Sequence, residues 1–274
     1  MARDLISVVM PVYRASAEYL SRSIQSILEQ DYPHWELIIV EDPSPNTTGE
    51  LIKSFRDERI VHVINSGRTG FVAQINRAVT LARGLFVARM DADDISTKER
   101  LGRQIDFLIS HPDIHVVGSN LYIIDERGES LGERRYPENS EAIGNNMRLR
   151  NVIAHPSVML RKKDLIAAGG YTEEFGTLAD YDLWARMTVS GKKFFNLTQP
   201  LLRYRIHRDA TKNTLLKKQL SDTVKIKKKY FRFRQGWSLA CELRYWAENC
   251  LKLFPKSFIY YLFIKLHTQK ITLP

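Results

Sequence analysis

The sequence predicts an α/β protein with a mostly parallel central sheet, helices on both faces of the sheet and a mainly helical C-terminal extension. Over the first 90 residues, short β-branched apolar runs alternate with segments of helical periodicity, as in repeated strand–helix–strand units. Acidic residues follow two of these runs, at the sheet edge where open α/β folds bind ligands. After about residue 211 the chain becomes rich in lysine.

The N-terminal half is expected to hold four strands joined by three helices. Each strand is a short run rich in valine and isoleucine, whereas each helix repeats apolar residues every three or four positions. Alternation at these lengths favours parallel strands with helical crossovers. In chain order, the expected elements are strand 6–13, helix 18–28, strand 35–40, helix 47–55, strand 60–64, helix 72–82 and strand 85–90.

The pattern is less regular after the fourth strand. We expect this half to build the pocket of a second substrate. The expected elements are a helix over 97–109, a strand over 114–124 and a turn over 125–130 centred on Gly128, followed by shorter elements interrupted by Gly144, Pro156 and the Gly169–Gly170 pair. The predicted domains are a catalytic domain over 1–210, divided at about residue 95, and an extension over 211–274.

The composition is that of an ordinary globular protein, with 274 residues, 44% of them hydrophobic and 26% charged. Cys241 and Cys250 match neither a zinc site nor a redox motif, so a reducing compartment is expected. The N-terminus lacks the features of a signal peptide, and no run reaches the roughly 18–20 apolar residues of a spanning helix. A cytoplasmic location is therefore expected.

The net charge of +10 is concentrated near the C-terminus. Such a segment fits nucleic acid, anionic lipid or a solvated helix face. The aromatic residues that follow fit either a membrane-surface element or a helical cap packed on the catalytic domain. The basic residues are Lys212, Lys217, Lys218, Lys225, Lys227, Lys228, Lys229, Arg232 and Arg234, and the aromatic residues include Trp237, Trp246, Tyr260 and Tyr261.

The acidic cluster Asp91–Asp94 directly follows the fourth strand. In an extended segment, Asp91 and Asp93 would project to the same side and share one divalent cation, for which oxygen ligands favour Mg or Mn. The alternative is a solvated turn in which Asp94 or Ser96 caps the next helix. Glu41 and Asp42 follow the second strand at the same sheet edge, where they can accept hydrogen bonds from a nucleotide.

No glycine-rich phosphate loop follows the first strand, which disfavours a Rossmann dehydrogenase. A bound nucleotide diphosphate would then need another source of positive charge, such as a metal ion held by the aspartates.

Together these motifs resemble the inverting, nucleotide-sugar-dependent glycosyltransferases of family 2, which have the GT-A fold, and in particular their bacterial surface-polysaccharide members. The resemblance runs from about residue 5 to residue 208, and it includes a DxD box. The segments that carry it are 7–13, 36–42, 88–94, 154–159, 169–171, 180–184 and 202–207.

The resemblance implies roles for individual residues. Asp180 would be the catalytic base, Asp42 would contact uracil, Asp91 the ribose, and Asp93 the metal, Mn or Mg. His207 would complete the metal site, although a structural role is the simpler interpretation. The other residues expected to bind the nucleotide-sugar are Pro11, Tyr13, Asn76 and Arg205, the last on the diphosphate or else in a surface ion pair.

The sequence departs from the family pattern at two places. Ala179 precedes the expected base where the family commonly has glutamate, and Pro43-Ser44-Pro45 replaces the usual loop after the second strand. Two further residues have open interpretations: His155 borders the acceptor pocket or is a loop histidine, and Trp184 walls that pocket or belongs to the core.

The resemblance implies transfer of a hexose or N-acetylhexosamine from a UDP-sugar to a sugar acceptor. A polyprenyl-diphosphate-linked intermediate of O-antigen, capsule or exopolysaccharide synthesis is expected, at the inner face of the cytoplasmic membrane. A nucleotidyltransferase acting on a sugar phosphate is the runner-up, but it ordinarily opens with a glycine-rich basic loop. A nucleic-acid-binding module is disfavoured because the positive charge is confined to the tail.

Overall fold

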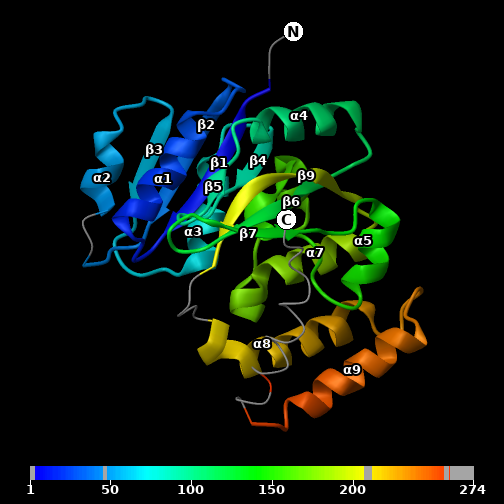
Figure 1. The fold of residues 1–274 in the computed structure, drawn as a ribbon. Coiled ribbons are helices and arrows are strands. Elements are labelled where there is room, and N and C mark those ends of the chain that lie inside the picture. The colour runs from blue at the N-terminus through cyan, green and yellow to red at the C-terminus, as the bar shows by residue number, and fades with distance from the viewer. Residues whose placement is uncertain (1–3, 46–47, 207–211, 256–258, 260–274) are drawn as a thin grey trace.

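The computed structural model describes residues 4–45, 48–206, 212–255 and 259. In the sheet, the strands lie in the order β3-β2-β1-β4-β8-β6-β9-β5, and β7 pairs with β6 (Figure 1). The strands are β1 (Ile6–Val12), β2 (Trp35–Glu41), β3 (Ile60–Ile64), β4 (Phe86–Arg89), β5 (Ile95–Ser96), β6 (Val116–Ile124), β7 (Ser130–Arg134), β8 (Met159–Arg161) and β9 (Phe194–Arg205).

Helices connect and cover these strands. The α-helices are α1 (Ala17–Leu28), α2 (Thr48–Ser54), α3 (Phe71–Leu81), α4 (Arg100–Ser110), α5 (Ser140–Met147), α6 (Lys162–Ala167), α7 (Ala179–Val189), α8 (Lys212–Ile226) and α9 (Leu239–Leu251). Two short 3₁₀ segments, η1 (His155–Ser157) and η2 (Glu173–Leu178), and one π-helical turn, η3 (Lys227–Phe231), complete the elements.

The parallel half of the sheet confirms the predicted fold class. Strand β1 pairs in parallel with both β2 and β4, and β2 pairs in parallel with β3. The carboxyl ends of β1, β2 and β4 therefore meet at one edge of the sheet, as ligand-binding α/β folds require. The seven elements predicted before residue 90 are all present, with ends that differ by one or two residues; Thr47 lies outside the described residues.

Alternating side chains along the parallel strands form two separate cores. One core contains Val8 and Met10 with the buried faces of α1, α2 and α4. The other contains Val9 and Val40 with α3, α5, α6 and α7. Helices thus cover both faces of the sheet, as predicted (Figure 1).

The second half of the sheet is mixed. Strand β8 runs antiparallel to both β4 and β6, whereas β9 runs parallel to β6. The helix predicted from residue 97 begins instead at Arg100, with Glu99 at its N-cap position and no side-chain cap. Capping of this helix by Asp94 or Ser96 is therefore wrong, because Asp94 precedes β5 and Ser96 belongs to it, whereas Glu99 occupies the N-cap position.

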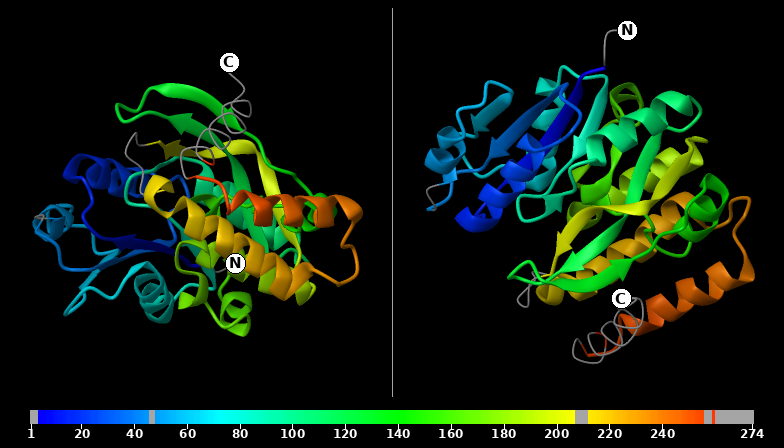
Figure 2. Two further views of the ribbon diagram at one scale, coloured as in Figure 1. Left: turned by 90° about the horizontal axis from the view of Figure 1, so that it is seen from below. Right: turned by 45° about the horizontal axis from the view of Figure 1, so that its top comes forward.

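The C-terminal extension packs on the catalytic domain. Helix α8 lies between the domain and α9 in Figure 1 and in the right view of Figure 2. Ile226, Tyr230 and Phe231 belong to the same core cluster as Trp184 of α7. The predicted boundary at residue 210 falls within residues 207–211, which are outside the described part, as are Tyr260 and Tyr261.

Acidic residues from other parts of the chain pair with several lysines and arginines of the basic run. The partners from other parts of the chain form Lys227–Glu248, Lys229–Glu174 and Arg232–Glu242, and within α8 Lys225 pairs with Asp222. Within the described residues, no helix has both the length and the apolar composition needed to cross a membrane. Cys241 and Cys250 are free thiols.

Candidate functional site

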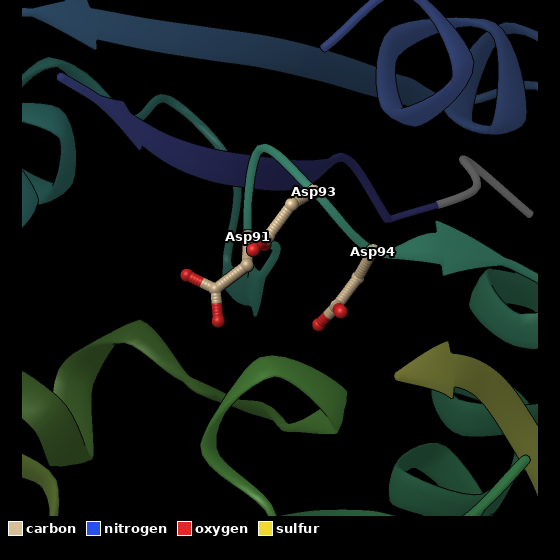
Figure 3. A group of neighbouring side chains, drawn as sticks. All are labelled: Asp91, Asp93 and Asp94. Atoms are coloured by element: carbon tan, nitrogen blue, oxygen red, sulfur yellow. The ribbon is translucent and has the colours of Figure 1, made fainter. Parts of the chain in front are cut away.

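The acidic cluster lies in a turn between β4 and β5. The expected extended conformation is wrong here, because Ala92 and Asp93 form a turn after β4 ends at Arg89. The expected convergence is nevertheless present, since Asp91, Asp93 and Asp94 each offer a carboxylate oxygen within 4.8 Å of the others. Figure 3 shows the three side chains directed into the same space.

Asp94 is the most deeply buried member of the cluster, with 1% of its surface exposed. Burial, and then the charges of Asp91 and Asp93, raise the pKa of this carboxyl well above its ordinary value. Its Oδ1 accepts a hydrogen bond from the backbone N–H of Arg205 at 2.9 Å, whereas its buried Oδ2 has no partner among the described residues. A hard divalent cation fits this donor set and would satisfy the orphaned oxygen.

Two buried arginines, which sequence analysis did not identify, support the acidic turn. Arg89, the last residue of β4, is 1% exposed and pairs with Asp91. Arg100 is fully buried and donates to the Arg89 carbonyl at 2.6 Å. The sequence does contain a signal for Arg89, because it is a charged residue in an otherwise apolar strand. An arginine is rarely buried without a partner, so this position indicates a nearby acidic group.

Arg205 braces the same turn from β9. Its Nε donates to the Asp93 carbonyl at 2.9 Å, and its Nη1 donates to the carbonyls of Asp125 and Glu126 at 2.9 and 3.1 Å. Its guanidinium also lies over the ring of Tyr19. Most of its donors are thus committed to backbone, and diphosphate binding by Arg205 stays a prediction. His207, the other expected ligand near this turn, lies outside the described residues.

Asp42, at the end of β2, anchors the loop before α3. It accepts hydrogen bonds from the backbone N–H groups of Thr69 and Gly70 at 2.9 and 2.8 Å, and from the Asn65 amide at 2.7 Å. Burial would raise its pKa, but these hydrogen bonds lower the pKa below its ordinary value. Asp42 is therefore held ionised beside the position expected for the nucleotide base.

The other predicted nucleotide contacts lie on two different parts of the fold. Pro11 is buried in β1 beside Val40 of β2, and Tyr13 follows β1 with the Arg68 guanidinium 4.5 Å from its ring centre. Asn76, on α3, instead exchanges two hydrogen bonds with the backbone of Tyr171, at 2.8 and 3.0 Å. The Asn76 amide thus fixes the loop that contains Tyr171. The sequence pattern did not predict this partner.

Asp180 occupies the first turn of α7. Burial raises its pKa to about 6, and the Asp91 charge acts in the same direction. The Asn151 amide donates to Asp180 Oδ2 at 2.8 Å and fixes the orientation of the carboxylate. Asn151 is a further residue that sequence analysis did not identify.

Aromatic side chains border this region. His155 Nε2 lies 3.0 Å from the Tyr171 hydroxyl, and its ring contacts Phe71 and Trp184. Burial, and then the Arg89 charge, lower the pKa of His155 well below its ordinary value, so this imidazole is neutral at pH 7. Trp184 is fully buried and belongs to the core.

Comparison with known proteins identifies relatives with the same type of sequence. Residues 7–168 match Glycosyl transferase family 2. The chain is 33% identical to an uncharacterized glycosyltransferase of Methanocaldococcus jannaschii, over 97% of this chain and 90% of the relative. It is 34% identical to the O-antigen biosynthesis glycosyltransferase WbnJ of Escherichia coli, over 78% of this chain and 84% of the relative. The UDP-Glc:alpha-D-GlcNAc-diphosphoundecaprenol beta-1,3-glucosyltransferase WfgD of E. coli is 36% identical, over 39% of this chain and 42% of the relative.

Solved structures with the same fold support the predicted GT-A architecture. S. aureus TarS in complex with UDP aligns with a TM-score of 0.58 and 18% identity, covering 85% of this chain and 74% of that chain. The mannosyltransferase PcManGT from Pyrobaculum calidifontis, in complex with GDP-Man and Mn2+, aligns with a TM-score of 0.64 and 15% identity. The alignment covers 99% of this chain and 77% of that chain. At these identities the likeness establishes the fold.

The raised pKa of Asp180 predicts a pH-dependent gain in stability on neutral substitution. Folding favours the protonated form of this carboxyl, so its contribution to stability decreases as pH rises from about 4 to about 6 and stays low above that range. We expect Asp180→Asn to raise the melting temperature by a few degrees at pH 8 and by less at pH 4, as measured by calorimetry. An equal change at both pH values would contradict the assignment.

The acidic turn predicts binding of a divalent cation that can be measured without any substrate. Mn or Mg should raise the melting temperature of the wild-type chain, because the cation binds the folded state. Asp93→Asn and Asp94→Asn should abolish this shift, and Asp94→Asn should also stabilise the metal-free chain by removing a buried charge. The matched control is Asp106→Asn, at an exposed position on α4. Persistence of the shift in both site variants would refute the metal site.

Proposed function

The chain belongs to glycosyl transferase family 2, and from this membership we propose that it is an inverting, metal-dependent glycosyltransferase that uses a UDP-sugar. The transferred group would be a hexose or an N-acetylhexosamine. The observation that carries the proposal is the presence of two features: an acidic turn able to hold a cation, and a separate, half-buried carboxyl in the first turn of α7 whose pKa of about 6 suits a general base.

The donor is proposed to bind across the ends of β1, β2 and β4. Asp42 would accept from the uracil, Asp91 would bind the ribose, and Tyr13 would flank the nucleotide. A divalent cation held by Asp93 with Asp91 and Asp94 would neutralise charge on the leaving diphosphate when bound. His207 and Arg205 are proposed as secondary contacts of the metal and the diphosphate. TarS bound to UDP and PcManGT bound to GDP-Man and Mn2+ support a nucleotide-sugar and metal site on this fold.

Asp180 is proposed as the base. At pH 7 a carboxyl with a pKa of about 6 is mostly ionised, yet it is more basic than an exposed aspartate. It would take the proton of an acceptor hydroxyl while that oxygen attacks the anomeric carbon and the bond to the nucleoside diphosphate breaks. One displacement inverts the anomeric centre. The hydrogen bond from Asn151 to Oδ2 directs the carboxylate without neutralising it.

The acceptor is proposed to be a polyprenyl-diphosphate-linked sugar in surface polysaccharide synthesis. WbnJ serves O-antigen biosynthesis, and the name of WfgD specifies a diphosphoundecaprenol-linked sugar acceptor, which supports the same acceptor class here. A nucleotidyltransferase remains the alternative enzyme class, and production of a nucleotide-sugar from a sugar phosphate would favour it. No feature of the described residues favours nucleic acid as a partner.

Contact with the inner face of the cytoplasmic membrane is proposed through α9. Leu239, Leu243 and Trp246 are 75%, 64% and 53% exposed, and their spacing places them on one side of the helix. Leu253, in the turn that follows α9, is 85% exposed. Exposed basic residues, including Lys228 and Arg234, lie on the adjoining elements. A helix with an outward apolar stripe beside basic residues has the composition of an interfacial element.

Transfer assays with a panel of UDP-sugars test the proposed reaction. We expect metal-dependent release of UDP in the presence of a lipid-linked acceptor. Asp180→Asn should lower kcat by about 10²–10⁴-fold, because the general base is lost, while UDP still raises the melting temperature. Asp106→Asn serves as the control with wild-type rates. Wild-type turnover by Asp180→Asn would exclude this residue as the base, and no response to any UDP-sugar would exclude the proposed donor.

Vesicle sedimentation tests the membrane contact. Deleting the extension would remove Ile226 and Phe231 from the core cluster that they share with Trp184 of α7, so point substitutions are preferable. Leu239→Glu with Leu243→Glu should weaken binding to phosphatidylcholine–phosphatidylglycerol vesicles by about tenfold or more, because two apolar anchors are lost. Ile109→Glu, at an exposed position on α4 at the opposite end of the molecule in Figure 1, is the matched control. Equal binding by all three proteins would argue against α9 as the contact.

A further inference from the structure

Tyr230 of the C-terminal extension contacts α7, the helix that carries the proposed base. Its hydroxyl donates a hydrogen bond of 2.8 Å to Asp182 Oδ1, across 48 residues of sequence. Asp182 is fully buried and lies two residues after Asp180, in the first turn of α7. The extension therefore contacts the same helical turn that positions Asp180.

The carboxylate of Asp182 also binds two other side chains. Its Oδ2 accepts hydrogen bonds from Thr172 Oγ1 and Arg186 Nε, both at 2.9 Å. Arg186 in turn donates through Nη2 to the Gly170 carbonyl at 2.7 Å, next to Tyr171 and its contact with His155. A buried carboxylate of this kind is stable because each oxygen is paired, and loss of any donor leaves part of its charge uncompensated.

The π-helical turn η3 fixes Tyr230 from the other side. The backbone N–H of Arg232 donates to the Lys227 carbonyl at 2.8 Å, which is the i to i+5 bond of a π-helix. Lys227 is 1% exposed and pairs with Glu248 of α9 at 2.5 Å. The turn is thus attached to α9 through Lys227 and to α7 through Tyr230, and π-helical turns occur frequently at functional sites.

We propose that Tyr230 is a positioning residue for the reaction, acting through Asp182 to hold the first turn of α7 and hence the Asp180 carboxylate. The inference rests on the proposed role of Asp180 as base. A displacement of about 1 Å in a reacting group can cost about 10²-fold in rate, so a small shift of this turn has a measurable effect. The extension would then contribute to the reaction through Tyr230 in addition to carrying α9, the proposed membrane contact.

The test compares Tyr230→Phe with Tyr245→Phe in the full chain. Tyr245 is also buried in the extension, but it lies on α9 and packs against Trp237 and Trp246, without a hydrogen bond to α7. Both variants lose one hydroxyl. We expect Tyr230→Phe to lower kcat for transfer by about tenfold with the KM for the UDP-sugar changed less than about twofold, because the donor site lies at the ends of other elements.

Hydrogen exchange supplies a readout that does not depend on turnover. The amides of Leu183 and Trp184 donate to carbonyls in the first turn of α7, as in any α-helix. Tyr230→Phe should accelerate exchange at these amides, and Tyr245→Phe should not.

The outcomes separate the two proposals. A selective loss of kcat together with faster exchange supports the positioning role. Unchanged kcat, or equal losses in both tyrosine variants, would overturn it while leaving Asp180 as the base. If wild-type protein transfers no sugar from any UDP-sugar, the proposed function fails. The positioning role is still tested in that case, because unchanged hydrogen exchange in Tyr230→Phe would show that Tyr230 does not hold the first turn of α7.

Discussion

Concentrated negative charge at the end of β4 is the constraint on which the rest of the structure depends. Three carboxylates meet in one turn, and burial of Asp94 makes their mutual repulsion more costly. Cationic and N–H groups offset part of this cost: Arg89, at the end of β4 itself, pairs with Asp91, and the backbone N–H of Arg205 in the distant strand β9 binds Asp94. The end of β9 is therefore fastened to the end of β4, and the two halves of the sheet meet at the site.

The surroundings shift the pKa values of two other carboxyls, those of buried Asp42 and half-buried Asp180, in opposite directions. Asp42 accepts hydrogen bonds from Thr69, Gly70 and Asn65, which keep its pKa low and the group permanently charged. Asp180 has one side-chain donor, Asn151, and burial dominates, so its pKa rises. Asp42 is thus held as an anion, whereas Asp180 can exchange a proton near neutral pH. Surroundings that shift two carboxyl pKa values apart allow one site to contain a binding group and a reacting group. The raised pKa also costs stability, which is typical of catalytic groups.

The sequence predicted the parallel half of the fold because β1, β2 and β4 are buried on both faces and all four strands are short, mostly apolar runs. It predicted the acidic cluster because carboxylates at a strand end are a local pattern. It could not predict β5 and β8, which have two and three residues and owe their pairing to β9, β4 and β6. Long-range partners, such as Tyr171 for Asn76, also leave no trace in local spacing.

The charge of the C-terminal extension also shows what local sequence pattern cannot predict. Its lysine-rich composition predicted a surface for solvent or lipid, yet Lys227 is buried against Glu248, and Tyr230 beside it bonds Asp182. A π-helical turn makes this possible, because its wider winding departs from the 3.6-residue period by which a buried face is recognised in sequence. The inner surface of the extension is therefore occupied by the catalytic domain, and its outer surface, the apolar stripe of α9, is the part left for a partner. One segment thus contacts α7 through Tyr230 and leaves the apolar stripe of α9 exposed, with α8 between α9 and the domain in Figure 1.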